Sequence, residues 1–412
     1  MKRLLLLAPF AAAEQLLAPA SYVMLTPLAL SHGAIYYSHW ISAIAFSAIS
    51  QFLSAGYTAV QVRERSVGSG SPCTSLSMDE AETTALWILI ACVGIALLAA
   101  VTGEFWSPFG SISYWGIGLM IAAISELDKF VTADLRSKQK YRTTFTLEFV
   151  GRIIWAAAFF VGMLLNFVEP ISLVAVSFLL RLAAKLAIIT VRNEHSWLLR
   201  AITNVYKFSV RGLLRRSGWI FGQVIGGSAI TIADRFLVSQ LFGAVFFAAY
   251  FPAYQLSSLC FNLSASSATV LLSMREKEIA TILHWKRLAA TTAFASLPNF
   301  ALYLLGPEII HLWLPHQFAS ISYTMFFFVN TSFMLLAMLS PFHFILLRAQ
   351  RDRAVSIANN TSGIVYLIGI ALTWGRNEQA ILVLRMLPPI VQFIFYFSSL
   401  SKLSGVASRR AV

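Results

Sequence analysis

The chain has 412 residues, of which 58% are apolar and only 12% are charged. A soluble domain of this length carries roughly twice that charged fraction, so the composition excludes an ordinary cytosolic enzyme, a disulfide-rich secreted domain and a disordered chain. One membrane-spanning helix needs about 20 mostly apolar residues, and twelve such helices need about 240, which is close to the apolar content. The composition therefore predicts an all-α integral membrane protein with about twelve transmembrane helices.

Apolar segments separated by polar or charged clusters mark the expected spans. They lie near residues 5–30, 40–60, 84–101, 111–128, 145–165, 171–191, 217–237, 244–272, 288–305, 320–346, 354–374 and 380–400. The first segment also resembles a secretory signal peptide, because Met1–Arg3 is basic and Ala11–Ala13 offers a small-residue cleavage site. The apolar run continues to Leu30, however, and an even number of spans needs this helix, so we expect it to be retained.

Lysine and arginine residues indicate which side of the membrane each loop faces. Loops on one side, together with both chain ends, carry 25 of the 31 Lys and Arg residues; the opposite loops carry two, and four fall inside spans. The positive-inside rule places the basic loops and both termini in the cytoplasm. Because the basic residues only punctuate apolar runs, the net charge of +13 does not indicate a nucleic-acid partner.

The sequence lacks the common motifs of catalysis. It contains no G-x-x-x-x-G-K-[ST] phosphate loop and no H-E-x-x-H, C-x-x-C or G-x-S-x-G pattern. The longest expected external loop, 306–319, is also too short to be the large catalytic loop of a membrane-embedded polysaccharide polymerase. We therefore expect neither an enzyme nor a cofactor or metal site.

Two short segments 210 residues apart have the same pattern. Gly33–Trp40 follows the first expected span and Gly243–Tyr250 follows the seventh, and both read small-small-β-branched-aromatic-aromatic-x-x-aromatic. This repetition favours two pseudo-symmetric bundles of six helices, with any substrate site near mid-membrane. We expect lobes at 1–191 and 217–412, joined by a basic cytoplasmic linker at 192–216.

Two of the basic residues inside spans are neighbours. Arg181 and Lys185 lie one helical turn apart on one face of the sixth span, where like charges repel each other. An isolated charge at the bilayer centre costs roughly 3 kcal/mol on insertion scales, so the pair requires an anion. That anion is either a protein carboxylate, for which Glu14 in the first span is the obvious candidate, or a negatively charged substrate in a wet cavity. We expect the substrate-facing arrangement.

Three further features of the spans are unusual. Arg152 follows Glu148 by one helical turn, which suits an intrahelical ion pair as well as a contact with substrate. Arg385 precedes two consecutive prolines, and it either reaches toward the external surface or contributes to substrate binding. Three prolines, among them Pro19, favour a bend in the first span. Glu14 and Pro19 are therefore the expected coupling or gating element, the alternative being a helix bent by packing alone with Glu14 in a salt bridge.

Residues spread along the whole chain carry a family resemblance. They are Gly33-Ala34 with Tyr37 and Trp40, Gly56 with Arg63-Glu64-Arg65, Asp234–Val238 through Gly243 and Tyr250, Gly306-Pro307-Glu308 with Leu312-Trp313-Leu314, and Leu346–Arg353. In this order they resemble the polysaccharide (O-antigen and exopolysaccharide) flippases of the MOP exporter superfamily, which also contains the MATE drug exporters. The resemblance implies a MOP/MATE-like fold of two six-helix lobes.

The same resemblance implies a function. It is the flipping of an undecaprenyl-pyrophosphate-linked oligosaccharide across the bacterial cytoplasmic (inner) membrane by alternating access, for lipopolysaccharide or exopolysaccharide export. Membrane lipids, a polysaccharide polymerase and a chain-length regulator are the implied partners. Arg181 and Lys185 would bind the headgroup, with Arg152 and Arg385 as secondary contacts, because arginine suits phosphate geometry. The alternatives are a cation-coupled small-molecule exporter of the MATE type and a non-transporting scaffold of polysaccharide assembly.

Overall fold

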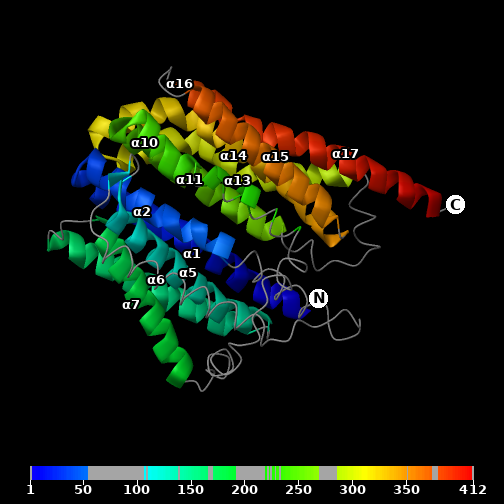
Figure 1. Cartoon of the computed structure of the whole chain (residues 1–412). Helices are drawn as coiled ribbons and strands as arrows, with labels where there is room; N and C mark the ends of the chain where they lie inside the picture. Colours follow the sequence, from blue (N-terminus) through cyan, green and yellow to red (C-terminus); the bar gives the residue numbers. More distant parts are fainter. Residues whose placement is uncertain are drawn as a thin grey trace. The chain divides into compact units, whose positions relative to one another are not determined.

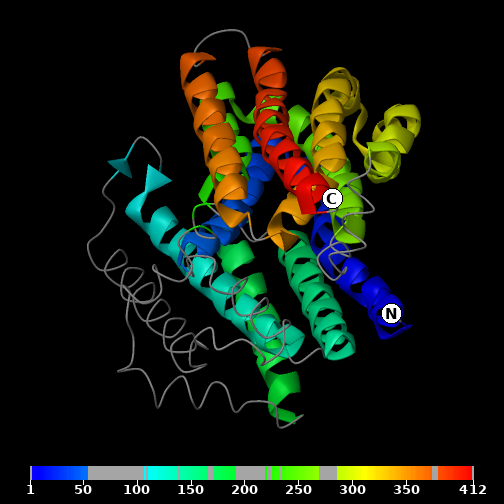
Figure 2. The ribbon, with the colours of Figure 1, turned by 90° about the vertical axis from the view of Figure 1, so that its right-hand side faces the viewer.

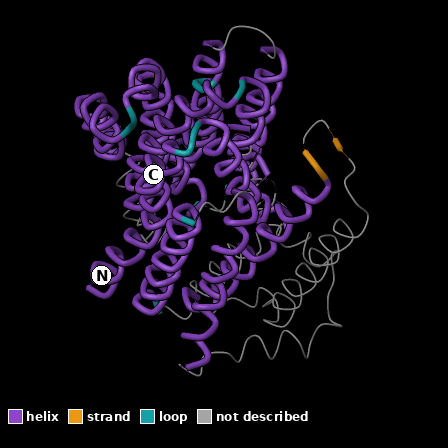
Figure 3. The backbone as a smooth tube through the Cα atoms, turned by 90° about the vertical axis from the view of Figure 1, so that its left-hand side faces the viewer, coloured by secondary structure: helices purple, strands orange, loops and turns teal. Residues whose placement is uncertain are grey.

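The computed structural model of the chain is almost entirely helical (Figure 1). It describes residues 2–53, 106–107, 110–137, 140–165, 170–191, 219, 222, 225–227, 229–231, 233–268, 285–349, 351–373 and 379–410. The span expected near 84–101 and the linker expected at 192–216 lie outside these residues. The short antiparallel strands β1 (Trp106–Ser107) and β2 (Gly110–Ser111) precede a long helix, and Figure 3 shows them in orange.

The helices follow the apolar segments of the sequence. In chain order they are α1 (Lys2–Ser31), α2 (Ala34–Leu53), α5 (Ile112–Ser137), α6 (Tyr141–Leu164), α7 (Pro170–Val191), the π-helical turn η2 (Ala233–Leu237), α10 (Val238–Phe242), α11 (Ala244–Ala268), α13 (Trp285–Trp313), α14 (His316–Arg348), α15 (Asp352–Thr373), α16 (Gln379–Leu384) and α17 (Leu387–Arg410). Within the described residues, seven helical segments are long and apolar enough to cross a membrane. Large apolar side chains such as Leu164, Leu304 and Phe397 are exposed on them, as expected for surfaces that face lipid.

The chain folds into two compact units, and neither is a continuous stretch of sequence. Unit 1 comprises Met1–Ala34, Ile225–Ala233 and Leu241–Val412, and unit 2 comprises Ile35–Val224 and Asp234–Gln240. In this division α1 groups with the helices of the C-terminal half, and the expected lobes at 1–191 and 217–412 stay a prediction. The short segment Asp234–Gln240, in turn, belongs with α2, where Ser42 and Ser239 share a hydrogen bond of 3.1 Å.

Specific polar contacts hold α1 in unit 1. The Thr26 hydroxyl on α1 donates a hydrogen bond to Oε1 of Gln255 on α11, at 2.5 Å in a buried position. The indole nitrogen of Trp313, at the end of α13, donates to the carbonyl of Val23 at 3.0 Å. Buried hydrogen bonds fix a partner as well as contribute stability, since an unpaired polar group there is costly. These contacts across the sequence connect α1 to α11 and α13 within unit 1.

The internal repeat is visible in the backbone. Gly33, between α1 and α2, has φ 104°, and Gly243, between α10 and α11, has φ 85°. Both angles lie in the left-handed region, which residues with a Cβ rarely adopt, so each glycine allows a short junction between helices, of two residues at Gly33 and of one at Gly243. The aromatic residues that follow at equivalent positions are all fully buried: Tyr37, Trp40, Phe247 and Tyr250. The shared sequence pattern therefore corresponds to a shared turn.

In unit 1, α14 packs against α11, α13 and α17 (Figure 2). The side-chain amide of Asn299 on α13 donates to Oδ1 of Asn330 on α14 at 3.0 Å, and the amide of Asn330 donates to the carbonyl of Asn299 at 2.9 Å. Gly306 allows close contact between the same helices, because a Cβ there would collide with the ring of Phe326.

The external loop expected at 306–319 is wrong, because most of these residues are helical. Helix α13 continues to Trp313 and α14 begins at His316, which leaves only two residues between them.

Candidate functional site

Four charged side chains meet inside unit 2, where α5, α6 and α7 lie side by side (Figure 1). Nη2 of Arg181 lies 2.6 Å from Oδ2 of Asp128 and 2.8 Å from Oε2 of Glu148. Nζ of Lys185 lies 2.5 Å from Oδ1 of Asp128 and 2.7 Å from Oε1 of Glu148. Each cation binds both carboxylates and each carboxylate binds both cations. We call these four residues the tetrad.

The positions of the tetrad residues along their helices explain why they meet. Arg181 and Lys185 are four residues apart, so they project from the same face of α7. At 1.5 Å per residue, Asp128 lies about 14 Å from the end of α5, Glu148 about 11 Å from the start of α6 and Lys185 about 9 Å from the end of α7. These are the three helix ends that the positive-inside rule predicts to be cytoplasmic, which stays a prediction. The four charges therefore lie at one level, inside the expected membrane thickness.

Gly151 on α6 makes room for the two cations. A Cβ at this position would lie 2.9 Å from Cε of Lys185 and 3.1 Å from Cγ of Arg181. The aliphatic parts of both side chains thus cross α6 directly over the glycine, and their charged ends reach Glu148 from there. A larger residue would push one or both cations away from their carboxylates. This glycine was not predicted from the sequence, although its place one turn after Glu148 is a signal that could have found it.

The tetrad is buried and formally neutral. The side chain of Lys185 is 0% exposed, and those of Arg181, Asp128 and Glu148 are at most 10% exposed. Buried ion pairs of this kind add little net stability, because removing charges from water offsets their attraction. Removing a single partner is different, since it leaves an uncompensated buried charge and costs about 3–5 kcal/mol. The cluster therefore tolerates balanced changes much better than unbalanced ones.

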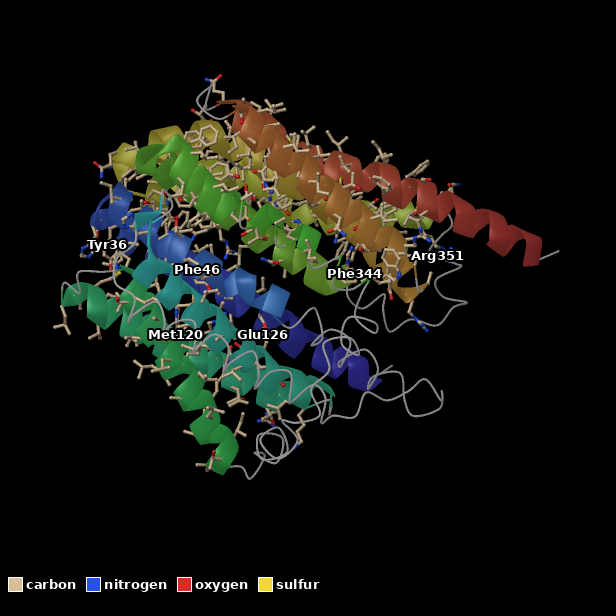
Figure 4. All side chains as sticks on the ribbon, in the orientation of Figure 1. Tyr36, Phe46, Met120, Glu126, Phe344 and Arg351 are labelled. Carbon is tan, nitrogen blue, oxygen red and sulfur yellow. The ribbon has the colours of Figure 1, made fainter. Side chains whose placement is uncertain are left out.

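Further charges surround the tetrad on its own helices. On α5, Glu126 is buried, and one of its carboxylate oxygens lies 3.6 Å from Nζ of Lys129; Glu126 is labelled in Figure 4. On α6, Arg152 interacts electrostatically with Glu148, and its guanidinium carbon lies 5.9 Å from the ring centre of Trp155. On α5, the two acidic residues Glu126 and Asp128 thus have one neighbouring cation, Lys129. On α6, the one acidic residue, Glu148, has one neighbouring cation, Arg152.

The structure provides the anion that Arg181 and Lys185 require, from an unexpected source. Both cations are neutralised by Asp128 and Glu148, so this conformation shows the protein-carboxylate alternative rather than the substrate-facing one. An ion pair of Glu148 with Arg152 was one of the two alternatives for these residues; in the structure the carboxylate of Glu148 binds the two cations of α7 and also interacts electrostatically with Arg152. Binding of these cations to a substrate stays a prediction.

The expected coupling element is only partly described. Glu14 and Pro19 both lie in α1, which continues from Lys2 to Ser31 as one helix. The side chain of Glu14 lies outside the described part of the chain. The protein carboxylates found next to Arg181 come from α5 and α6 instead. A gating role for Glu14 and Pro19 therefore stays a prediction.

Arg385 occupies an aromatic cage in unit 1. Its guanidinium carbon lies 5.0 Å from the ring centre of Phe333, 5.2 Å from that of Tyr254 and 5.7 Å from that of Tyr366. The residue is 2% exposed, so the alternative in which it reaches toward the external surface is wrong. The two following prolines interrupt the span as expected, because α16 ends one residue before Arg385 and α17 begins two residues after it. Ser332 donates a hydrogen bond of 2.8 Å to the freed carbonyl of Arg385.

A second buried network was not foreseen from the sequence. The hydroxyl of Tyr396 on α17 donates to Oδ1 of Asn359 on α15 at 3.1 Å, and Nδ1 of His343 on α14 lies 2.9 Å from the same hydroxyl. Since the hydroxyl proton is used toward Asn359, Nδ1 of His343 is the donor in the second bond. Among the described residues, no group of three or more His, Cys, Asp or Glu side chains is placed to hold a metal ion.

Comparison with solved structures identifies the fold. The lipid II flippase MurJ, in an inward closed conformation, has a TM-score of 0.69 and 13% identity, and the match covers 96% of this chain and 87% of that chain. The fold is that of the MOP transporters. A variant of the Vibrio cholerae MATE transporter VcmN matches with a TM-score of 0.64 and 15% identity, covering 97% of each chain.

A third MOP structure widens the range of functions found with this fold. A MOP superfamily transporter from Pyrococcus furiosus, whose reverse polarity of the binding pocket suggests a different function, matches with a TM-score of 0.59 and 12% identity over 96% of each chain. No protein-family model and no curated protein sequence matches this chain. The likeness confirms the expected all-α membrane fold of two helical lobes.

Proposed function

We propose that this chain flips a polyprenyl-diphosphate-linked oligosaccharide from the cytoplasmic to the external leaflet of the bacterial inner membrane. Alternating access between the two lobes would move the substrate, with both chain termini in the cytoplasm. The observation that carries this proposal is the buried pair Arg181 and Lys185 within a MOP transporter fold, to which the lipid II flippase MurJ is similar. Ionisable residues at membrane depth generally mark the path of a substrate or ion.

The chemistry of the pair suits a diphosphate. The planar guanidinium of Arg181 offers two parallel donors to one phosphate group, and the ammonium of Lys185 acts as a point charge for the other. Together they carry the two positive charges that match a diphosphate diester. Their level near the cytoplasmic ends of the helices suits a headgroup that enters from the cytoplasmic leaflet. Arg152 would be a secondary contact, since it is only half-buried one turn from Glu148.

The proposal is tested in cells with a variant that keeps the tetrad neutral. Replacing Arg181 and Lys185 alone would leave two buried carboxylates without cations, so the test variant combines Arg181→Gln and Lys185→Gln with Asp128→Asn and Glu148→Gln. We expect normal protein levels, no polymer at the cell surface and accumulation of the lipid-linked oligosaccharide on the cytoplasmic leaflet. Full export by this variant would reject the assigned role of the pair.

Depletion of the whole protein separates transport from scaffolding. A flippase predicts that depletion leaves the lipid-linked oligosaccharide on the cytoplasmic leaflet, out of reach of a polymerase and chain-length regulator that act externally. A non-transporting scaffold predicts no such accumulation. The leaflet is determined by the accessibility of the oligosaccharide to a membrane-impermeant glycosidase in intact cells and in lysed cells.

A cation-coupled exporter of the MATE type is the second candidate. The two buried carboxylates Asp128 and Glu148 favour it, because carboxylates suit cationic cargo or coupling ions. Similarity to VcmN, a MATE transporter, agrees with this alternative. A deletion strain that becomes sensitive to cationic drugs and keeps its surface polysaccharide would support the exporter. Loss of polysaccharide with unchanged drug resistance would support the flippase.

A further inference from the structure

We propose that the tetrad is a proton–diphosphate exchange site, in which Asp128 and Glu148 each take up a proton as a diphosphate replaces them on Arg181 and Lys185. This inference rests on the proposed function, because it assumes that the pair binds the diphosphate of the substrate. It goes beyond that function by assigning a coupling ion and its binding groups.

The charge of the site requires the protons. The four side chains carry two positive and two negative charges, and all are at least nine-tenths buried. A diphosphate diester brings two further negative charges, which would leave this buried site with a net charge of −2. Uncompensated buried charges are strongly unfavourable, and the usual response of a buried carboxylate is to bind a proton. Two protons, one on each carboxylate, restore neutrality.

The geometry makes the exchange concerted. Each carboxylate uses one oxygen for Arg181 and the other for Lys185, so neither cation can turn to a new anion while both carboxylates stay ionised. In the exchange, an O–H bond forms on Asp128 and another on Glu148, the four cation–carboxylate ion pairs break, and phosphate oxygens take both cations. A protonated carboxyl group is also a hydrogen-bond donor. Asp128 and Glu148 therefore remain useful in the loaded site, as donors to the phosphate oxygens.

Other charged groups lie beside the two carboxylates on the same helices. Asp128 shares α5 with a second buried carboxylate, Glu126, and Lys129, which interacts with both, is the cation beside them. Glu148 has Arg152 as an additional cation on its own helix. Both carboxylates also face Arg181 and Lys185 of α7.

Proton uptake on binding tests the exchange. The purified full-length protein in detergent is mixed, in weakly buffered solution with a pH indicator, with a short-chain isoprenyl diphosphate sugar. This probe is a diester whose two charges do not titrate near neutral pH. We expect about two protons taken up per probe bound, and affinity that rises up to about 100-fold for each unit by which the pH falls, which is tenfold per proton. Binding without proton uptake would overturn the exchange.

Variants assign the protons to residues. Asp128→Asn should take up about one proton per probe bound, and Asp128→Asn combined with Glu148→Gln should bind the probe with none, since amides imitate the protonated carboxyls. Glu126→Gln is the matched control, because it removes a buried carboxylate of the same helix from outside the tetrad, and it should behave as wild type. Proton uptake that persists in the double variant would overturn the assignment of the protons to Asp128 and Glu148. If a variant does not fold, the wild-type measurement of proton uptake still tests the exchange.

The outcome is distinguishable from failure of the proposed function. If vesicles containing the protein translocate a lipid-linked oligosaccharide but binding of the probe takes up no protons, the exchange is wrong and the flippase stands. If the protein neither binds the diphosphate probe nor translocates the lipid-linked oligosaccharide, the proposed function is wrong, and the exchange is wrong with it.

Discussion

A double-mutant cycle on the tetrad is the sharpest test of its structure. Glu148→Gln removes one negative charge and leaves Arg181 and Lys185 with only Asp128 to neutralise them. Lys185→Met removes one positive charge, keeps a similar volume and leaves two carboxylates with only Arg181. The double variant is neutral again and keeps the ion pair between Arg181 and Asp128, whose closest atoms are 2.6 Å apart.

The expected magnitudes follow from burial. Lys185 is 0% exposed and Glu148 is 8% exposed, so each single variant leaves an uncompensated buried charge and should lose about 3–5 kcal/mol of unfolding free energy. That is a large part of the roughly 5–15 kcal/mol typical of a folded protein. The double variant should recover about 2–3 kcal/mol relative to the sum of the two single changes, which is within the range seen for residues in one network.

Denaturant unfolding in detergent micelles, followed by tryptophan fluorescence, measures all four corners of the cycle. The three variants are compared with wild type under the same detergent and lipid conditions, so that only the differences matter. If the losses of the two single variants simply add in the double variant, the side chains are not coupled. In that case the contacts of Lys185 with Glu148 do not exist in the folded protein, and the reasoning about the tetrad is refuted.

Three further changes test other parts of the fold. Gly226→Ala should cost about 2–3 kcal/mol of stability, because a Cβ there would lie 2.6 Å from the backbone nitrogen of Asn360. The adjacent Gly227→Ala has nothing within 4 Å of its Cβ and should be neutral within about 0.5 kcal/mol; equal effects in thermal unfolding would contradict the packing of this segment on α15. Gly243→Ala should cost about 1–2 kcal/mol because of its φ of 85°, while Gly243→Asn should cost less; a neutral alanine would show that the junction is not left-handed. Arg385→Lys should lower stability by about 1–2 kcal/mol despite the retained charge, since an ammonium cannot stack on the three rings as a guanidinium does; an unchanged unfolding midpoint would argue against the cage.

Much of the fold could be predicted because it depends on local sequence. Runs of apolar residues set the helices, since a membrane leaves few other ways to satisfy the backbone. The matched segments that begin at Gly33 and Gly243 correctly indicated two equivalent turns, because a left-handed junction needs glycine wherever it recurs. The break before the consecutive prolines near Arg385 was also expected from their missing backbone donors.

The partners of the buried charges could not be predicted in the same way. Asp128 was assigned to the end of a span at 111–128, whereas α5 continues to Ser137 and leaves Asp128 well inside the helix. Which helix faces meet depends on the rotation of each helix about its axis, and apolar composition on all sides gives little information on that angle. For the same reason the sequence offered Glu14 as a partner for Arg181, and Arg152 as the partner of Glu148.

The assignment of α1 to unit 1 has a similar cause. Its contacts with Gln255 and Trp313 join residues more than 200 positions apart, and no short pattern records such a pairing. Arg385 illustrates the same limit, since its cage takes one ring from each of α11, α14 and α15. The charged residues could be recognised as unusual from the sequence, but their surroundings are a property of the packed helices.

Translocation by the purified protein tests the central claim most directly. Proteoliposomes are prepared with a fluorescent polyprenyl-diphosphate oligosaccharide, and its movement between leaflets is followed by quenching with a membrane-impermeant reductant. We expect rapid exchange with the wild-type chain and a background rate with the neutral variant that combines Asp128→Asn, Glu148→Gln, Arg181→Gln and Lys185→Gln. A wild-type rate equal to that of protein-free vesicles, or a neutral variant as fast as wild type, would contradict the account.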